Sequence, residues 1–118
     1  MLTIDFITVD CRNPMLLAEF WCEMLDWEVG GQDDESAWIE PRNKDLVVSP
    51  RILFYKNPDT KLVKNRLHFD LRPDHQQLEV ERALALGATR ANIGQTGEES
   101  WIVMADPEGN EFCILREP

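Results

Sequence analysis

The chain has 118 residues, a formal net charge of −10 from 22 acidic and 12 basic side chains, and a hydrophobic content of 43%. This size suits one domain that buries a core of its own, so a disordered chain is not expected. The excess of acidic groups repels phosphate backbones and anionic lipids, and we expect no nucleic-acid partner and no membrane partner.

Three cysteines stand at positions 11, 22 and 113, and no two of them have the Cys-x-x-Cys spacing of a redox or zinc motif. An odd number of cysteines without such spacing argues against a disulfide framework. The first residues lack the basic start and the apolar run of a secretory signal. These features together predict a protein of the reducing cytoplasm.

The first half of the chain predicts a strand, a helix and three more strands. The first strand is expected over residues 2–9. Asn13 is a good helix cap and Pro14 suits the first helical position, so a helix is expected to follow and to end near Asp26. Gly30-Gly31 is expected to stop the next strand. The three later strands are predicted at residues 27–29, 37–40 and 52–55.

The second half predicts the same order of elements. Asp74 with Gln77 three residues later resembles a capping box, and Gly87 is a natural end for the helix that follows. The sequence Asp106-Pro107-Glu108-Gly109 is typical of a type I turn. Strands are predicted at residues 65–71, 89–93, 101–104 and 110–115.

The two halves form a repeat of the strand–helix–three-strand pattern. The caps Asn13 and Asp74 and the tryptophans Trp38 and Trp101 stand at nearly the same separation along the chain. Neither half is long enough to bury a core alone, so both copies are expected to form one domain. We predict a single domain over residues 1–118, with module one at 1–57, a turn-rich linker at 58–62 and module two at 63–118.

The order and spacing of several short motifs resemble the vicinal oxygen chelate superfamily of glyoxalases, bleomycin-resistance proteins and dioxygenases, in its small glyoxalase-like branch. These motifs cover almost the whole chain and lie at residues 4–9, 20–21, 25–27, 65–71, 86–88 and 106–112. The resemblance implies an α+β fold in which two βαβββ modules form a curved, cup-like mixed sheet. It also implies that a ligand or a metal lies inside the cup.

Metal-using members of this superfamily place four ligands, usually His, Glu or Gln, at matching strand positions of the two modules. The position in the first strand of the second module falls on His68. The matching position in the first module falls on Phe6, which cannot bind a metal. Cys113 stands where the last strand of the second module usually has Glu. The matching position in the first module falls on Phe54 or Tyr55, because a shift of one residue in register changes the face.

This ligand set is too short, so we expect no metal of the family type and no other cofactor. The alternative is a divalent metal whose ligands are completed by an acidic side chain. Strand alternation places Asp70 on the same face as His68. The acidic candidates are Asp5, Asp10 and Asp70.

Aromatic side chains at strand positions predict a cup lined for a small planar or apolar ligand. His68 is the candidate catalytic residue, because its ordinary pKa suits a general acid or base. A buried histidine of the core is the alternative. For Cys113, a small buried core residue is favoured over a nucleophile. The complete set of predicted ligand-binding residues is Phe6, Trp38, Phe54, Tyr55, His68, Trp101 and Cys113.

Three functional hypotheses follow. The first is a protein that binds a small molecule in an aromatic cup without the full metal site of the family. The second is a glyoxalase-type lyase or isomerase that uses His68, with or without a divalent metal. The third is a structural or regulatory protein whose cup is filled by its own side chains. By analogy with the fold, we also expect a homodimer.

Overall fold

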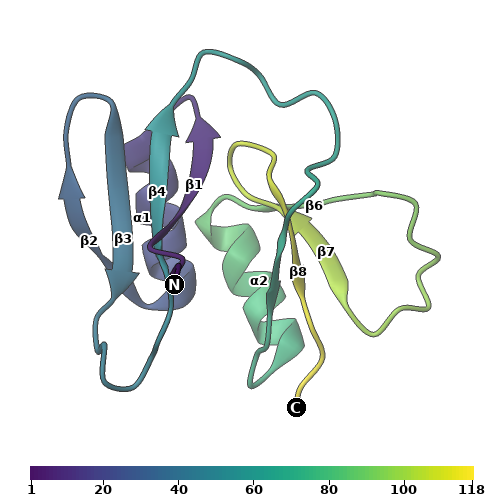
Figure 1. Ribbon diagram of the computed structural model, residues 1–118. Helices are drawn as coiled ribbons and strands as arrows, with labels where there is room; N and C mark the ends of the chain where they lie inside the picture. Colours follow the sequence, from purple (N-terminus) through teal and green to yellow (C-terminus); the bar gives the residue numbers. More distant parts are fainter. The chain divides into compact units, whose positions relative to one another are not determined.

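The computed structural model describes residues 1–118 and divides into two compact units, Met1–Thr60 and Lys61–Pro118. Each unit contains one strand, one helix and three further strands, in that order (Figure 1). The predicted α+β class and the predicted repeat of elements are therefore confirmed. The division between the units lies within the turn-rich segment 58–62.

The first unit is a four-stranded mixed sheet with one helix against one of its faces (Figure 1). The order across the sheet is β1-β4-β3-β2, with β1 parallel to β4 and the other neighbours antiparallel. The elements are β1 (Phe6–Cys11), α1 (Pro14–Leu25), β2 (Trp27–Gln32), β3 (Ser36–Pro41) and β4 (Arg51–Lys56).

Helix α1 begins and ends where the sequence predicts. The side chain of Asn13 accepts a hydrogen bond from the Leu16 N–H, and Pro14 takes the first helical position. Asp26 ends the helix in a left-handed conformation, with φ of 55°. The buried side chains of the helix pack against the sheet and include Leu17, Ala18, Phe20, Trp21 and Met24.

Two strand predictions in the first unit were wrong in extent. Strand β1 begins at Phe6, and the preceding residues of the chain are exposed. Strand β2 passes through Gly30 and Gly31 and ends only at Gln32. A β-bulge lies between Val29 and Gly31, so the glycines bend the strand and do not terminate it.

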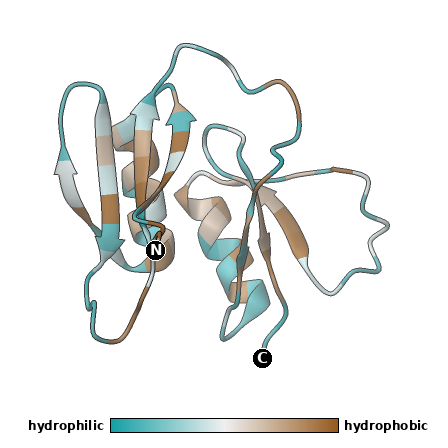
Figure 2. Ribbon diagram, in the orientation of Figure 1, coloured by the Kyte–Doolittle hydropathy of each residue, from teal (hydrophilic) through white to brown (hydrophobic).

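The second unit repeats this arrangement on a smaller scale. Its sheet has the order β5-β8-β7-β6, with β5 parallel to β8 and the other neighbours antiparallel. Figure 2 shows hydrophobic stretches on β7 and β8, and α2 is more polar than α1. The elements are β5 (Phe69–Leu71), α2 (Gln76–Leu86), β6 (Thr89–Arg90), β7 (Ile102–Ala105) and β8 (Glu111–Ile114).

The start of α2 differs from the prediction. The N-cap is His75 and not Asp74, and the His75 side chain makes no capping hydrogen bond. A carboxylate from the C-terminal tail takes that role, because Glu117 Oε2 accepts a hydrogen bond from the Gln76 N–H at 2.7 Å. The same hydrogen bond lowers the pKa of Glu117. At the other end, Gly87 is the predicted left-handed cap, with φ of 113°.

The strands of the second unit are shorter than predicted. Strand β5 has only three residues. Asn65, which was predicted to begin this strand, instead donates hydrogen bonds to the side chains of Glu111 and Asn110. Strand β6 has only two residues. Trp101 lies just outside β7 and is 44% exposed, so it is not the structural equivalent of Trp38 within β3.

The predicted turn between β7 and β8 is present. The Gly109 N–H donates to the Asp106 carbonyl at 2.9 Å, and Gly109 has φ of 89°. The Asp106 side chain is buried and accepts hydrogen bonds from the N–H groups of Glu108 and Asn110. These bonds fix the direction in which β8 begins.

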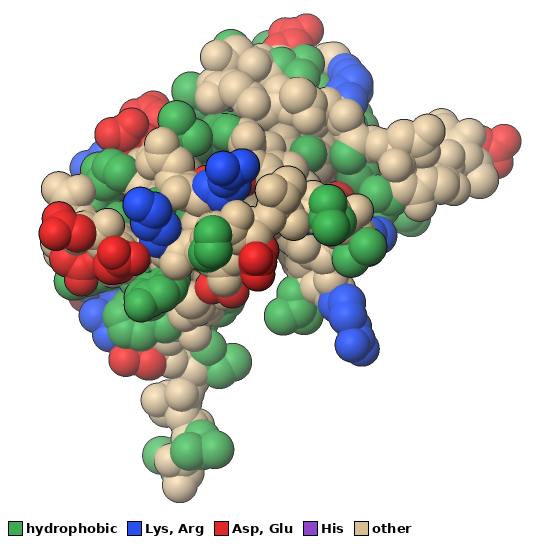
Figure 3. All heavy atoms as spheres, turned by 90° about the horizontal axis from the view of Figure 1, so that it is seen from above, with side chains coloured by type: hydrophobic (Ala, Val, Ile, Leu, Met, Phe, Trp, Pro, Cys, Tyr) green, Lys and Arg blue, Asp and Glu red, His purple; other side chains and the backbone are tan.

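The face of the surface drawn in Figure 3 is mixed in character. Figure 3 shows acidic and basic side chains interspersed on one face, with hydrophobic side chains exposed between them. Neither α1 nor α2 has the length and apolar character that a membrane span requires.

Candidate functional site

The ladder register assigns the side chains of the first sheet to its two faces. Phe6 lies opposite Arg51, and Trp38 lies opposite Leu53, two residues before Tyr55 in β4. Residues directly opposite in a ladder point to the same side of the sheet. The side of the sheet away from α1 therefore carries what we term the aromatic face, formed by Phe6, Trp38, Leu53 and Tyr55.

Phe54, one of the predicted ligand-binding residues, does not belong to the aromatic face. It lies opposite Val9 and Ala37, and its side chain is 0% exposed. Tyr55, the other alternative at this point of the sequence, is 47% exposed. Because successive residues of a strand alternate in direction, burial of Phe54 in the core presents Tyr55 on the aromatic face.

Trp38 is held in place by the two glycines of β2. A Cβ atom at Gly30 or Gly31 would overlap the indole ring of Trp38. The ring therefore lies across backbone that has no side chains, and this close approach is the reason that both positions are glycine. The indole is neither fully buried nor fully exposed. It provides a flat, anchored surface on the aromatic face.

One cation lies at the end of the aromatic face. The guanidinium carbon of Arg51 lies 3.9 Å from the centre of the Phe6 ring. Its Nη2 donates to Asp5 Oδ1 at 2.7 Å. The guanidinium is thus both stacked on an aromatic ring and paired with a carboxylate. The sequence alone does not predict that Arg51 stacks on Phe6, because the contact depends on the register between β1 and β4.

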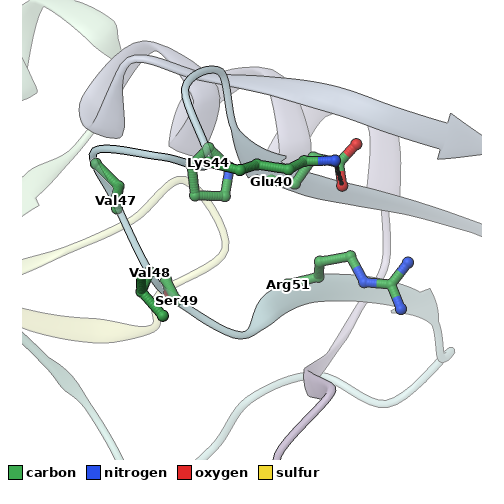
Figure 4. Close-up of a pocket in the computed structure, with 7 residues that line it drawn as sticks. Glu40, Lys44, Val47, Val48, Ser49 and Arg51 are labelled. Atoms are coloured by element: carbon green, nitrogen blue, oxygen red, sulfur yellow. Dashed lines mark ion pairs between the residues drawn. The ribbon is translucent and has the colours of Figure 1, made fainter.

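The first unit also has an open pocket of about 320 Å³, which the sequence did not predict (Figure 4). Val47, Val48 and Ser49 of the loop before β4 form one wall. The cations at its border are neutralised, because Lys44 Nζ lies 3.1 Å from a Glu40 carboxylate oxygen and Arg51 pairs with Asp5. None of the predicted ligand-binding residues lines this pocket, and it offers no free charged group for catalysis.

In the second unit, three side chains with metal-binding or acid–base chemistry come together. His68 precedes β5, Asp70 lies within β5, and Asp70 is opposite Cys113 of β8 in the parallel ladder. One donor atom from each lies within 4.8 Å of the others. We term these three residues the donor cluster. Asp70 entered the sequence analysis only as a supplementary ligand, but the structure places it between the other two.

The donor cluster combines an exposed pair with a buried thiol. His68 Nε2 lies 3.1 Å from Asp70 Oδ1, and the two side chains are 34% and 54% exposed. Cys113 is 6% exposed. Burial, and then the charge and hydrogen bonding of Asp70, raise the pKa of the Cys113 thiol, while the charge of Lys64 acts in the opposite sense. The free chain therefore holds Cys113 as a thiol, which is a poor nucleophile.

A partly buried ion pair supports the segment that leads to His68. Lys61 Nζ pairs with Glu111 Oε2, and Glu111 Oε1 accepts a hydrogen bond from the Asn65 N–H at 2.7 Å. Burial acts to raise the pKa of Glu111, but the hydrogen bonds from Lys61 and Asn65 and the Lys61 charge outweigh it and lower the pKa. The sequence analysis missed this pair, because its members are 50 positions apart in the chain.

The ligand positions that the family resemblance implies do not form a metal site of the family type. If His68 corresponds to Phe6, then Asp70 corresponds to Thr8. The ladder partner Cys113 then corresponds to Leu53, and not to Phe54 or Tyr55 as the sequence predicted. Phe6 and Leu53 carry no donor atom. The first unit therefore offers no ligand at the counterparts of His68 and Cys113, and the four-ligand arrangement of the family does not fit this chain.

Comparisons with known proteins agree with this architecture. A family model described as "Glyoxalase-like domain" matches residues 6–115. No curated protein matches the chain.

Several solved structures share the fold. A glyoxalase/bleomycin resistance protein/dioxygenase family enzyme from Burkholderia phytofirmans is 18% identical, with a TM-score of 0.72 over 96% of this chain and 97% of that chain. The trypanothione-dependent glyoxalase I of Leishmania major is 11% identical, with a TM-score of 0.68 and coverage of 99% and 88%. A bleomycin resistance determinant encoded on the transposon Tn5 is 14% identical, with a TM-score of 0.59 and 95% coverage of both chains.

The family match leaves out only residues 1–5 and 116–118. It therefore includes every strand and both helices. The solved structures support the same fold at low sequence identity. The chain belongs to the glyoxalase-like domain family.

Proposed function

We propose that this protein binds a small planar or apolar organic molecule on the aromatic face of its first unit. The observation that carries the proposal is the indole of Trp38, which lies flat across Gly30 and Gly31. An aromatic ring held in this way loses little freedom when a planar ligand stacks on it. Phe6 and Tyr55 extend the apolar surface on the same side of the sheet.

The polar groups near this face favour a ligand with a limited polar part. Arg51 is already paired with Asp5 and stacked on Phe6, so it orients a polar substituent without demanding a full negative charge. The exposed phenol of Tyr55 adds a hydrogen-bond donor. Two solved structures with this fold are named for organic molecules, bleomycin and trypanothione, which accords with binding of an organic ligand.

The experiment is a titration with 2-naphthol, a planar uncharged probe, monitored by tryptophan fluorescence. We expect saturable quenching in the unaltered chain and loss of the saturable part in Trp38→Ala. Trp101→Ala is the matched control, because it removes an exposed indole from the second unit. Equal loss in both variants, or unchanged binding in Trp38→Ala, would contradict the proposal.

A second candidate function rests on the short contact between His68 and Asp70. When His68 Nε2–H donates to the Asp70 carboxylate, the other ring nitrogen carries the lone pair and can accept a proton. That arrangement suits the acid–base steps of a lyase or isomerase of the glyoxalase type. The test is deuterium exchange at the α-carbon of hydroxyacetone, which His68→Gln should slow and His75→Gln should leave unchanged.

A further inference from the structure

We propose that the second unit by itself binds one thiophilic divalent cation, with zinc as the best match, through His68, Asp70 and Cys113. The site keeps two positions at which the family places its ligands, His68 and Cys113, and adds Asp70 as a third ligand. It differs from the four-ligand family arrangement because it takes no ligand from the first unit. It shares no residue with the aromatic face on which the proposed function rests.

The local structure explains why these three residues meet. His68 and Asp70 are two positions apart in an extended segment, so their side chains leave the backbone on the same side. Asp70 and Cys113 are direct partners in the parallel ladder between β5 and β8. The Lys61–Glu111 pair and the Asn65 hydrogen bond hold the segment before β5 to β8. Asp70 and Cys113 are therefore built into the sheet, and His68 directly precedes it.

The chemistry of the donors selects the kind of metal. An imidazole nitrogen, a carboxylate oxygen and a thiolate sulfur are all ligands of zinc in proteins. Calcium and magnesium prefer sets made only of oxygen atoms, and a sulfur donor disfavours them. Three protein ligands leave a fourth tetrahedral position for water or for a ligand, as in zinc sites that are not purely structural.

The distances are compatible with such a site after small side-chain movements. Donor atoms around a tetrahedral zinc lie about 3.5 Å apart, given metal–ligand distances of about 2.0–2.3 Å. His68 Nε2 and Asp70 Oδ1 are 3.1 Å apart, and the whole cluster spans no more than 4.8 Å. Cys113 is fixed in the sheet, whereas His68 and Asp70 are partly exposed and free to rotate toward it.

Metal binding and the second candidate function exclude each other at His68. A neutral imidazole has one in-plane lone pair. When one ring nitrogen uses it to bind a cation, the other nitrogen carries the proton and cannot act as a base. The aromatic face has no such conflict, because its residues belong to the first sheet. Failure of the zinc site would therefore leave the binding of a planar molecule unaffected, and the two proposals can be tested separately.

The experiment is a titration of the reduced, metal-free full chain with Co²⁺, followed by displacement with Zn²⁺. We expect one Co²⁺ per chain and a thiolate-to-cobalt charge-transfer band in the near ultraviolet. Cys113→Ser should abolish the band, and His68→Gln and Asp70→Asn should weaken binding by at least about tenfold. The matched controls Cys22→Ser, His75→Gln and Asp74→Asn should bind as the unaltered chain does.

The same titration gives the outcomes that would overturn the proposal. Absence of the band in the unaltered chain, or equal weakening in the control variants, would show that the cluster is not a metal site. Loss of binding in Tyr55→Phe would assign a ligand to the first unit and would also contradict it. If Cys113→Ser fails to fold by circular dichroism, Asp70→Asn decides the matter, because its side chain is more than half exposed and the substitution preserves its shape.

Discussion

The two units of this protein have the same order of elements and the same order of strands, but they differ in the chemistry of the side chains away from the helices. On the side of each sheet that carries the core, corresponding residues are apolar and buried. The register matches Ile52 with Phe112 and Phe54 with Ile114, and none of the four is more than 4% exposed.

On the other side of each sheet, the corresponding residues have diverged. Phe6 corresponds to His68, Thr8 to Asp70 and Leu53 to Cys113. One unit thus presents an aromatic face, and the other presents the donor cluster. The comparison teaches that the repeat constrains the side that must exclude water, whereas the opposite side is free to acquire different functions.

The largest expected effect concerns the buried side of the sheets. Phe54→Ala and Phe112→Ala should each lower the free energy of unfolding by about 3–5 kcal/mol, because each removes a fully buried ring. Tyr55→Ala, next to Phe54 but 47% exposed, should cost about 1 kcal/mol or less. Urea unfolding measures all three. A cost for Tyr55→Ala as large as that for Phe54→Ala would reverse our assignment of the two faces.

The next effect concerns the contact of the Trp38 ring with Gly30 and Gly31. Gly31→Ala should destabilise the chain by about 1–3 kcal/mol, because the new Cβ overlaps the indole. In a Trp38→Ala background, the same substitution should cost much less, since the overlap is gone. A double-mutant cycle of unfolding free energies checks this. A cost that is independent of Trp38 would mean that the ring does not lie on the glycines.

A pH-dependent effect distinguishes the second unit. Glu111→Gln should cost about 1–2 kcal/mol at neutral pH, because it removes the carboxylate that Lys61 and Asn65 stabilise. The pKa of Glu111 is lowered in the folded chain, so this stability is present at neutral pH and is lost as the pH falls through the range in which the carboxylate is protonated. Unfolding curves of the two proteins should therefore converge in acid. A constant difference across the pH range would exclude the ionic contribution.

The smallest effect concerns Arg51 in the first unit. Arg51→Lys keeps a positive charge near Asp5 but loses the flat guanidinium over Phe6. We expect a loss of about 0.5–1 kcal/mol in unfolding free energy, the usual value of an exposed cation–π contact. In a Phe6→Leu background the loss should disappear. A loss that persists in the Phe6→Leu background would mean that Arg51 does not stabilise the chain through the Phe6 ring.

Most of the fold could be predicted from the sequence, because local signals agreed with the tertiary structure. Asn13-Pro14 and Gly87 mark helix ends through chemistry that acts within a few residues. The start of α2 could not be predicted in the same way. The N–H of Gln76, at the start of this helix, donates to the Glu117 side chain, which lies 41 positions later in the chain. A contact over this separation leaves no local pattern, whereas Asp74 and Gln77 resemble a capping box.

Which residues form the aromatic face and the donor cluster depends on the register between strands, and local sequence patterns determine that register poorly. Alternation alone left Phe54 and Tyr55 as alternatives, and only the pairing with β1 and β3 separates them. Alternation along the segment that enters β5 was enough to place Asp70 beside His68. The contact of Asp70 with Cys113 joins two strands and required the ladder. Predictions within one element were therefore stronger than predictions that combine elements.

The divergence of the two sheet faces can be tested in one measurement, a Zn²⁺ titration of the isotope-labelled full chain followed by NMR. Our account predicts chemical-shift changes concentrated at His68, Asp70 and Cys113, with little change at Phe6 and Leu53, their counterparts in the first unit. Changes at Phe6 and Leu53 as large as those at Asp70 and Cys113 would contradict it.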